Sequence, residues 1–124
     1  MEMFESPVVV VIPGEREALR VLRLVAMDVG RLLGFGYDKI EDARLAVHEA
    51  AAVLVETGSD SITCQITAEG GSMAIAMSSM PAPSTWPPQD WEDSLGHLVL
   101  SHVAESLELD SKPSISFAIT PSRG

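Results

Sequence analysis

The stretch Asp38–Thr57, DKIEDARLAVHEAAAVLVET, predicts the helix around which the rest of the chain is organised. This helix is expected to begin at Asp38 or the next residue, with Asp38 as N-cap and Glu41 completing a capping box, and to end at Gly58. The run of alanines within it allows another element to approach its backbone closely. Its apolar residues recur with the three- and four-residue spacing of one buried helix face: Ile40, Ala43, Val47, Ala50 and Leu54.

A strand and a further helix are predicted on the N-terminal side of this stretch. The β-branched run Val8–Ile12 lies between Pro7 and Pro13, and it predicts a strand that is buried on both faces or at an interface. A helix follows from Glu15 to about Leu33 and ends at the glycines beyond it. The predicted buried stripe of this helix is Ala18, Leu22, Val25, Val29 and Leu32.

The C-terminal side predicts a hairpin, a loop, a helix and a last strand. Ser61–Ala68 and Ser72–Met77 read as two strands, and Gly70 and Gly71 between them suit a tight hairpin turn. The remaining elements are a proline-rich loop over Ser78–Gln89, a helix from Asp90 or Asp93 to about Leu107, a turn over Asp110–Pro113 and a strand over Ile115–Ile119.

The order of these elements predicts an α+β fold. Helices clustered between strands, outside βαβ units, indicate a two-layer α/β sandwich with helices on one face of a mixed, mostly antiparallel sheet. With 124 residues, 46% of them hydrophobic, the chain can bury a core without disulfides or metals, and it has no room for a second independent domain. We therefore expect residues 1–124 to form a single domain.

The charge of the chain limits its partners. A formal net charge of -10 repels nucleic acid and an anionic membrane surface, and it attracts a basic protein. The only cysteine, Cys64, cannot form an internal disulfide, and the histidines are not clustered as in a metal site. The N-terminal residues carry no basic region, and Val8–Ile12 is too short for a signal peptide or a membrane span. We therefore expect a cytoplasmic protein without a bound metal.

The segment Asp42–Leu54, and within it Arg44–Glu49 most strongly, resembles the first ATP-site helix of the RsbW-like anti-sigma factors, small serine kinases of the GHKL (histidine kinase-like) ATPase superfamily. The resemblance extends over most of the chain and implies a Bergerat-type sandwich, which agrees with the order of elements. It also implies an alternative sigma factor as partner and release by an anti-anti-sigma antagonist of the STAS type. In the family, homodimers are common and the first helix takes part in partner contact.

Three departures from the family pattern affect the ATP site. Glu49 stands where active members have a general base, but Val53 replaces the asparagine that holds magnesium four residues later. Ser78–Pro83 replaces an Asp-x-Gly-x-Gly turn that holds adenine, and it contains neither aspartate nor glycine. Of a glycine-rich lid only Gly96 remains. We therefore expect no ATP or magnesium cofactor and no catalytic residue, with Glu49 as a remnant of the base.

Two further sets of residues are candidates for partner contact or for closing the pocket. Arg16, Arg20 and Arg23 fall in one row of the first helix, opposite its apolar stripe. They form either a partner-binding row or a solvated face neutralised by neighbouring acids. The tryptophans Trp86 and Trp91, in and beside the proline-rich loop, are expected to pack over the empty pocket rather than to form a binding hot spot.

Three functions agree with these residues. The first is an anti-sigma factor-like regulator that sequesters an alternative sigma factor without ATP turnover. The second is an active or weakly active ATP-dependent serine kinase of the antagonist, with Glu49 as its base. The third is a pseudo-ATPase adaptor of the same fold that binds a regulatory protein other than a sigma factor. Titration with magnesium and ATP separates the first from the second, and co-purification of a sigma factor separates the first from the third.

Overall fold

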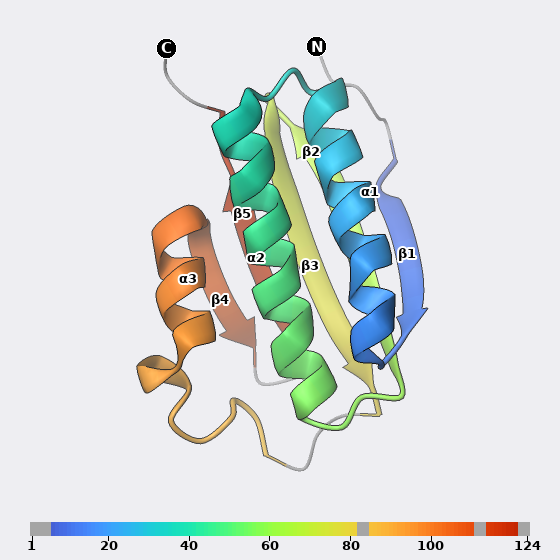
Figure 1. Ribbon diagram of the computed structural model, residues 1–124, viewed down its shortest axis with the longest axis vertical. Coiled ribbons are helices and arrows are strands. Elements are labelled where there is room, and N and C mark those ends of the chain that lie inside the picture. The colour runs from blue at the N-terminus through green and yellow to red at the C-terminus, as the bar shows by residue number, and fades with distance from the viewer. Residues whose placement is uncertain (1–5, 82–84, 111–113, 122–124) are drawn as a thin grey trace.

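The computed structural model describes residues 6–81, 85–110 and 114–121, which form two layers (Figure 1). Three α-helices cover one face of a five-stranded sheet. In chain order the elements are β1 (Val8–Pro13), the 3-10 turn η1 (Arg16–Ala18), α1 (Leu19–Leu32), α2 (Tyr37–Glu56), β2 (Ser61–Glu69), β3 (Ser72–Met80), the 3-10 turn η2 (Trp91–Asp93), α3 (Leu95–Val103), β4 (Glu105–Asp110) and β5 (Ser114–Ile119).

The strand order is β1-β2-β3-β5-β4, and every neighbouring pair is antiparallel. The predicted two-layer sandwich is therefore confirmed, whereas the expectation of a mixed sheet is wrong. The connections explain the difference. Two helices between β1 and β2 return the chain to the end at which β1 finished, so β2 runs in the opposite direction. One helix joins β3 to β4, but β5 is inserted between these two strands, so each still has antiparallel neighbours.

The third helix is shorter than the sequence predicts, and a strand takes its place. The helix α3 ends at Val103, and Ala104 is already extended, with φ -119° and ψ 158°. Leu107 and Leu109 are half-buried, whereas Glu108 between them is exposed, which is the two-residue period of a strand with one face on the core. The prediction of helix to Leu107 is therefore wrong, and β4 forms an edge of the sheet.

Several predicted boundaries also change. The helix α2 begins at Tyr37 with Gly36 as N-cap and without a side-chain cap, so the predicted Asp38 capping box does not form. The strand β3 continues to Met80, because Ser78–Met80 pair with the first residues of β2. The first three residues of the predicted loop are therefore strand. Residues 82–84 of that loop and residues 111–113 of the predicted turn lie outside the described part of the chain.

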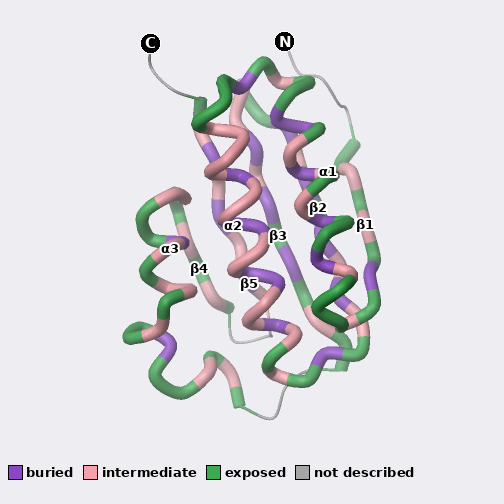
Figure 2. Tube along the Cα trace, in the orientation of Figure 1, coloured by how far each residue is buried: buried purple, intermediate pink, exposed green. Residues whose placement is uncertain are grey.

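The core lies between the helices and the inner face of the sheet (Figure 2). Four of the five predicted apolar residues of α2 are fully buried there: Ala43, Val47, Ala50 and Leu54. On α1 the buried side is shifted from the predicted one, since Leu32 is 48% exposed while Leu19 and Ala26 are buried. The hairpin between β2 and β3 is confirmed: Gly70 and Gly71 have φ of 56° and 83°, the left-handed conformation that a two-residue turn requires at both central positions.

Candidate functional site

The residues that mark the ATP site of the resembling family lie at one contact between α2 and α3. A Cβ atom at Gly96 would lie 3.6 Å from each of three atoms: Glu49 Oε1, Val53 Cγ2 and Trp91 Cζ3. This separation is ordinary van der Waals contact. The structure therefore brings together Glu49, Val53 and Gly96, which are far apart in sequence, and adds the indole of Trp91 to them.

The turn before α3 is held by Ser94. Its hydroxyl accepts a hydrogen bond from the backbone N–H of His97 at 3.1 Å and donates one to the carbonyl of Trp91 at 2.6 Å. Ser94 is therefore the N-cap of α3 and also ties the helix to η2. The ring of His97 meets the indole of Trp91 edge-on, with centroids 5.4 Å apart. These contacts fix Trp91 and Gly96 against α2.

The chemistry of this contact is mostly apolar. Val53 offers methyl groups, Trp91 offers a ring, and Gly96 offers only backbone, so Glu49 carries the one charged group. Trp91 is 9% exposed and belongs to the core, as the prediction that it packs over the pocket requires. Trp86 is half-buried and packs against the same core. Within residues 6–81, 85–110 and 114–121, no group of three or more side chains is arranged to hold a metal ion.

Arg44, in the stretch that carries the strongest resemblance, is bound within α2. Its guanidinium donates to the carboxylate of Glu41 at distances down to 2.8 Å. This hydrogen bond holds the pKa of Glu41 below its ordinary value and raises that of Arg44. The pair lies at i and i+3 on one helix, so it supports α2 rather than a ligand.

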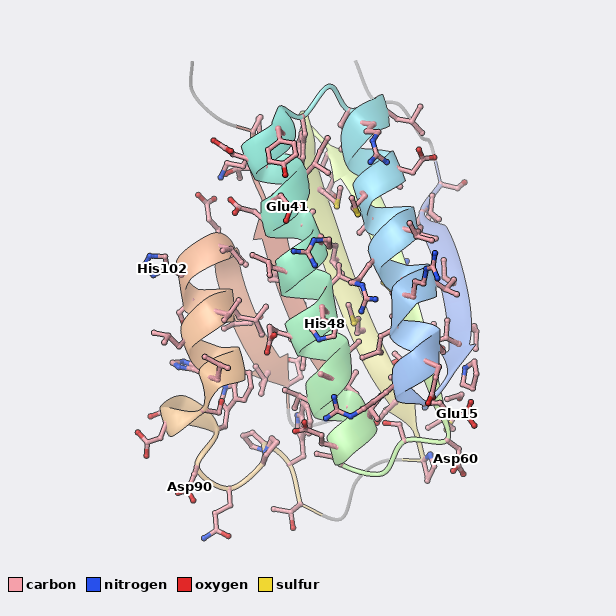
Figure 3. The ribbon with its side chains drawn as sticks, viewed as in Figure 1. Glu15, Glu41, His48, Asp60, Asp90 and His102 are labelled. Atoms are coloured by element: carbon pink, nitrogen blue, oxygen red, sulfur yellow. The ribbon has the colours of Figure 1, made fainter. Side chains whose placement is uncertain are left out.

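Two of the three predicted partner-binding arginines are bound to α2 instead of forming one free row. Arg16 forms an ion pair with Glu56 at 3.0 Å, and Arg23 Nη1 lies 2.9 Å from His48 Nδ1. Because arginine only donates, Nδ1 of His48 is the acceptor in this hydrogen bond. His48, labelled in Figure 3, thus joins α2 to α1. Residues 25 and 40 positions apart form these pairs, and no local sequence pattern indicates them.

Arg20 differs from the other two arginines. It is exposed, and in the described part of the chain it forms no ion pair. Beside it on α1 are two exposed apolar side chains, Val21 at 47% and Leu24 at 53%. We call Arg20, Val21 and Leu24 the α1 surface. A cation next to apolar side chains is a common composition for protein–protein contact.

The open face of the sheet carries a separate hollow of about 420 Å³. Polar and apolar residues of β2, β3 and β5 line it, together with Ser106 and Glu108 of β4. Neither Glu49, Val53 nor Gly96 contributes to it. This hollow is therefore distinct from the α2–α3 contact.

Serine-protein kinases named RsbW match part of the chain. The relatives from Bacillus thuringiensis (strain Al Hakam), Bacillus cereus (strain B4264) and Bacillus anthracis (strain A0248) are each 38% identical over 56 residues. The match covers 45% of this chain and only 34% of the length of each relative. No family model matches the chain. No helix within the described ranges is both long and apolar enough to cross a membrane.

Proposed function

We propose that this chain is an anti-sigma factor-like regulator that binds an alternative sigma factor directly and works without ATP turnover. The partial similarity to RsbW kinases supports the regulatory class. The observation that supports the absence of ATP turnover is the contact between α2 and α3, where Gly96 and Trp91 pack on Glu49 and Val53. A nucleotide at this place would have to displace α3. Val53 carries no oxygen, so its side chain cannot bind the magnesium that would accompany the nucleotide.

The α1 surface is the proposed contact for the sigma factor. Arg20 supplies a guanidinium that forms two parallel hydrogen bonds with a carboxylate, and Val21 and Leu24 supply apolar area beside it. Arg16 and Arg23 also belong to the proposed partner-binding set, and each contacts a residue of α2 in the free chain. An anti-anti-sigma antagonist of the STAS type is the proposed releasing partner. A cytoplasmic homodimer is the proposed form of the free protein.

The test is binding to purified alternative sigma factors from the source organism. We expect one of them to form a stable complex with the chain in the absence of ATP, and an antagonist protein to dissociate it without phosphate transfer. Size-exclusion chromatography with light scattering measures both steps. Failure of every alternative sigma factor to bind would contradict the proposal and favour the adaptor function.

A second candidate is an ATP-dependent serine kinase of the antagonist. Two observations favour it: the matched relatives are named serine-protein kinases, and Glu49 is retained on α2 with no hydrogen bond or ion pair among the described residues. Incubation of the chain with radiolabelled ATP and the antagonist decides between the two. Transfer of label to the antagonist that is lost in Glu49→Gln would establish the kinase.

A further inference from the structure

The helix α3 has a buried side that packs on α2 and, in addition, two exposed leucines. Its inner side packs on α2 through Gly96 and the buried Leu100. Its outer side carries Leu95, which is 70% exposed, and Leu98, which is 62% exposed and lies one turn further along. Isolated exposed leucines are common on protein surfaces, but a short helix with leucines on both sides has the composition of a buried helix.

A hollow of about 460 Å³ lies beside these two leucines. Leu95 and Leu98 line it together with the exposed carboxylates of Glu92 and Asp93, and His97 and Ser101 complete the wall. The lining of the hollow thus combines apolar side chains with carboxylates. We call Glu92, Asp93, Leu95 and Leu98 the α3 surface.

The stretch of sequence that contains the α3 surface carries charge of one sign only. Between Arg44 and Lys112 the sequence has ten Asp and Glu and no Lys or Arg, so the whole net charge of -10 belongs to this stretch. The described arginines lie on η1, α1 and the first half of α2, whereas α3 lies on the other side of α2 from α1 (Figure 1). The field at the α3 surface therefore attracts cations. A symmetric contact with a second copy is disfavoured there, because the same carboxylates would face one another.

We propose that the α3 surface docks a basic amphipathic helix of a protein partner. The leucines of the α3 surface contact the apolar stripe of that helix, and Glu92 and Asp93 pair with its Lys or Arg side chains. The inference rests on the composition of α3 and the charge of the chain. It does not depend on the state of the ATP site or on the partner of the α1 surface.

The test uses a synthetic helical peptide of about 18 residues as the probe, with leucines on one face and lysines on the others. A reference peptide has the same composition, but its leucines are spread around the helix. We expect the amphipathic peptide to bind and to shift the NMR resonances of Leu95 and Leu98. The double variant Leu95→Ser/Leu98→Ser should lose about tenfold or more in affinity, and Glu92→Gln/Asp93→Asn should lose affinity and salt dependence.

Two matched variants control for general effects of composition. Val9→Ser/Val11→Ser makes the same kind of apolar-to-polar change at two exposed positions of β1, and Glu15→Gln/Glu17→Gln removes the same charge elsewhere on the surface. Both should bind the peptide as the unmodified chain does, to within about twofold in affinity. Equal binding of the two peptides, or unchanged affinity in both α3-surface variants, would overturn the proposal. If Leu95→Ser/Leu98→Ser unfolds α3, the affinity of Glu92→Gln/Asp93→Asn alone decides whether the proposal stands.

Discussion

Gly96 lies where α3 packs on α2. A Cβ atom there would meet Glu49, Val53 and Trp91 at 3.6 Å, so the contact has room for a methyl group and for little more. Packing at this contact therefore excludes a large side chain but does not require a glycine, because an alanine would also fit. Val53 contributes to the same contact through a methyl group, at the position where a magnesium ligand is expected in the resembling family.

Substitutions at Gly96 test this packing directly. We expect Gly96→Ala to leave the free energy of unfolding unchanged or to raise it by up to about 1 kcal/mol, because alanine favours the helix and fits the contact. Gly96→Leu should lower it by about 1–3 kcal/mol, because its side chain overlaps Trp91 and Val53. Urea denaturation measures both. A leucine variant as stable as the alanine variant would show that α3 does not pack closely on α2.

Cys64 gives a pH dependence whose sign follows from its burial. Desolvation raises the pKa of its thiol from 9.0 to about 12. The folded chain therefore holds this proton between pH 9 and 12, where the unfolded chain releases it, so the thiol's contribution to stability is full below pH 9 and is lost as pH rises towards 12. We expect Cys64→Ala to remove this part of the decrease in the free energy of unfolding at alkaline pH, as measured by urea denaturation at several pH values. An unchanged alkaline slope in the variant would assign the loss to other groups.

At the scale of elements, α3 and its preceding turn determine what the site can do. The helix has nine residues, too short to be stable alone, so it depends on its cap and on α2. Ser94 supplies the cap and also binds the carbonyl of Trp91. The loss of this one hydroxyl would loosen both the helix and the tryptophan that packs beside Gly96.

We expect Ser94→Ala to lower the free energy of unfolding by about 1 kcal/mol, because the N–H of His97 and the carbonyl of Trp91 both lose a partner. Ser94→Asp keeps an acceptor for His97 and should recover part of that loss. Ser101→Ala, on the exposed side of the same helix, serves as the control and should change stability by less than about 0.5 kcal/mol. If the two alanine variants are equally stable, Ser94 does not hold α3.

Sequence reasoning is most accurate where one local pattern decides the structure. The stripe of α2 and the paired glycines of the hairpin are such patterns. It fails at β4, because the residues after Val103 continue an apolar spacing that suits a helix, and only pairing with β5 makes them a strand. The all-antiparallel order has the same cause, since the insertion of β5 beside β3 is a long-range choice.

The candidate site was predictable only in part. The motif positions Glu49, Val53 and Gly96 are visible in the sequence, whereas their meeting with Trp91 depends on how α3 lies on α2. Likewise the row of arginines is visible in the sequence as a helical pattern. Which of them contact α2 is not visible, because their partners, His48 and Glu56, are distant in sequence.

At the scale of the whole molecule, the two proposed contact surfaces differ in charge. The α1 surface carries Arg20, whereas the α3 surface carries the carboxylates of η2, and both include exposed apolar side chains. The helix α2 lies between α1 and α3 (Figure 1). One chain thus presents two chemically different surfaces to its partners. Under the proposed function, the α1 surface contacts the sigma factor and the α3 surface is available to a basic helix at the same time.

The contribution of Arg20 is separable from that of the fold. We expect Arg20→Ala to weaken sigma-factor binding by about tenfold while the free energy of unfolding stays within about 0.5 kcal/mol of the original. Arg31→Ala removes another exposed arginine of α1, which pairs with Asp28 at 3.9 Å, and it should leave binding intact. Isothermal titration calorimetry measures both affinities. If both variants weaken binding equally, the effect of Arg20 comes from the net charge of the chain and not from a specific contact.

Under the proposed function, α3, Trp91 and Val53 occupy the space in which a nucleotide and its metal would bind. Calorimetric titration of the chain with ATP in the presence of magnesium tests it most directly. We predict no saturable heat up to millimolar ATP, with or without the metal. One-to-one binding that requires magnesium and is lost in Glu49→Gln would contradict the account.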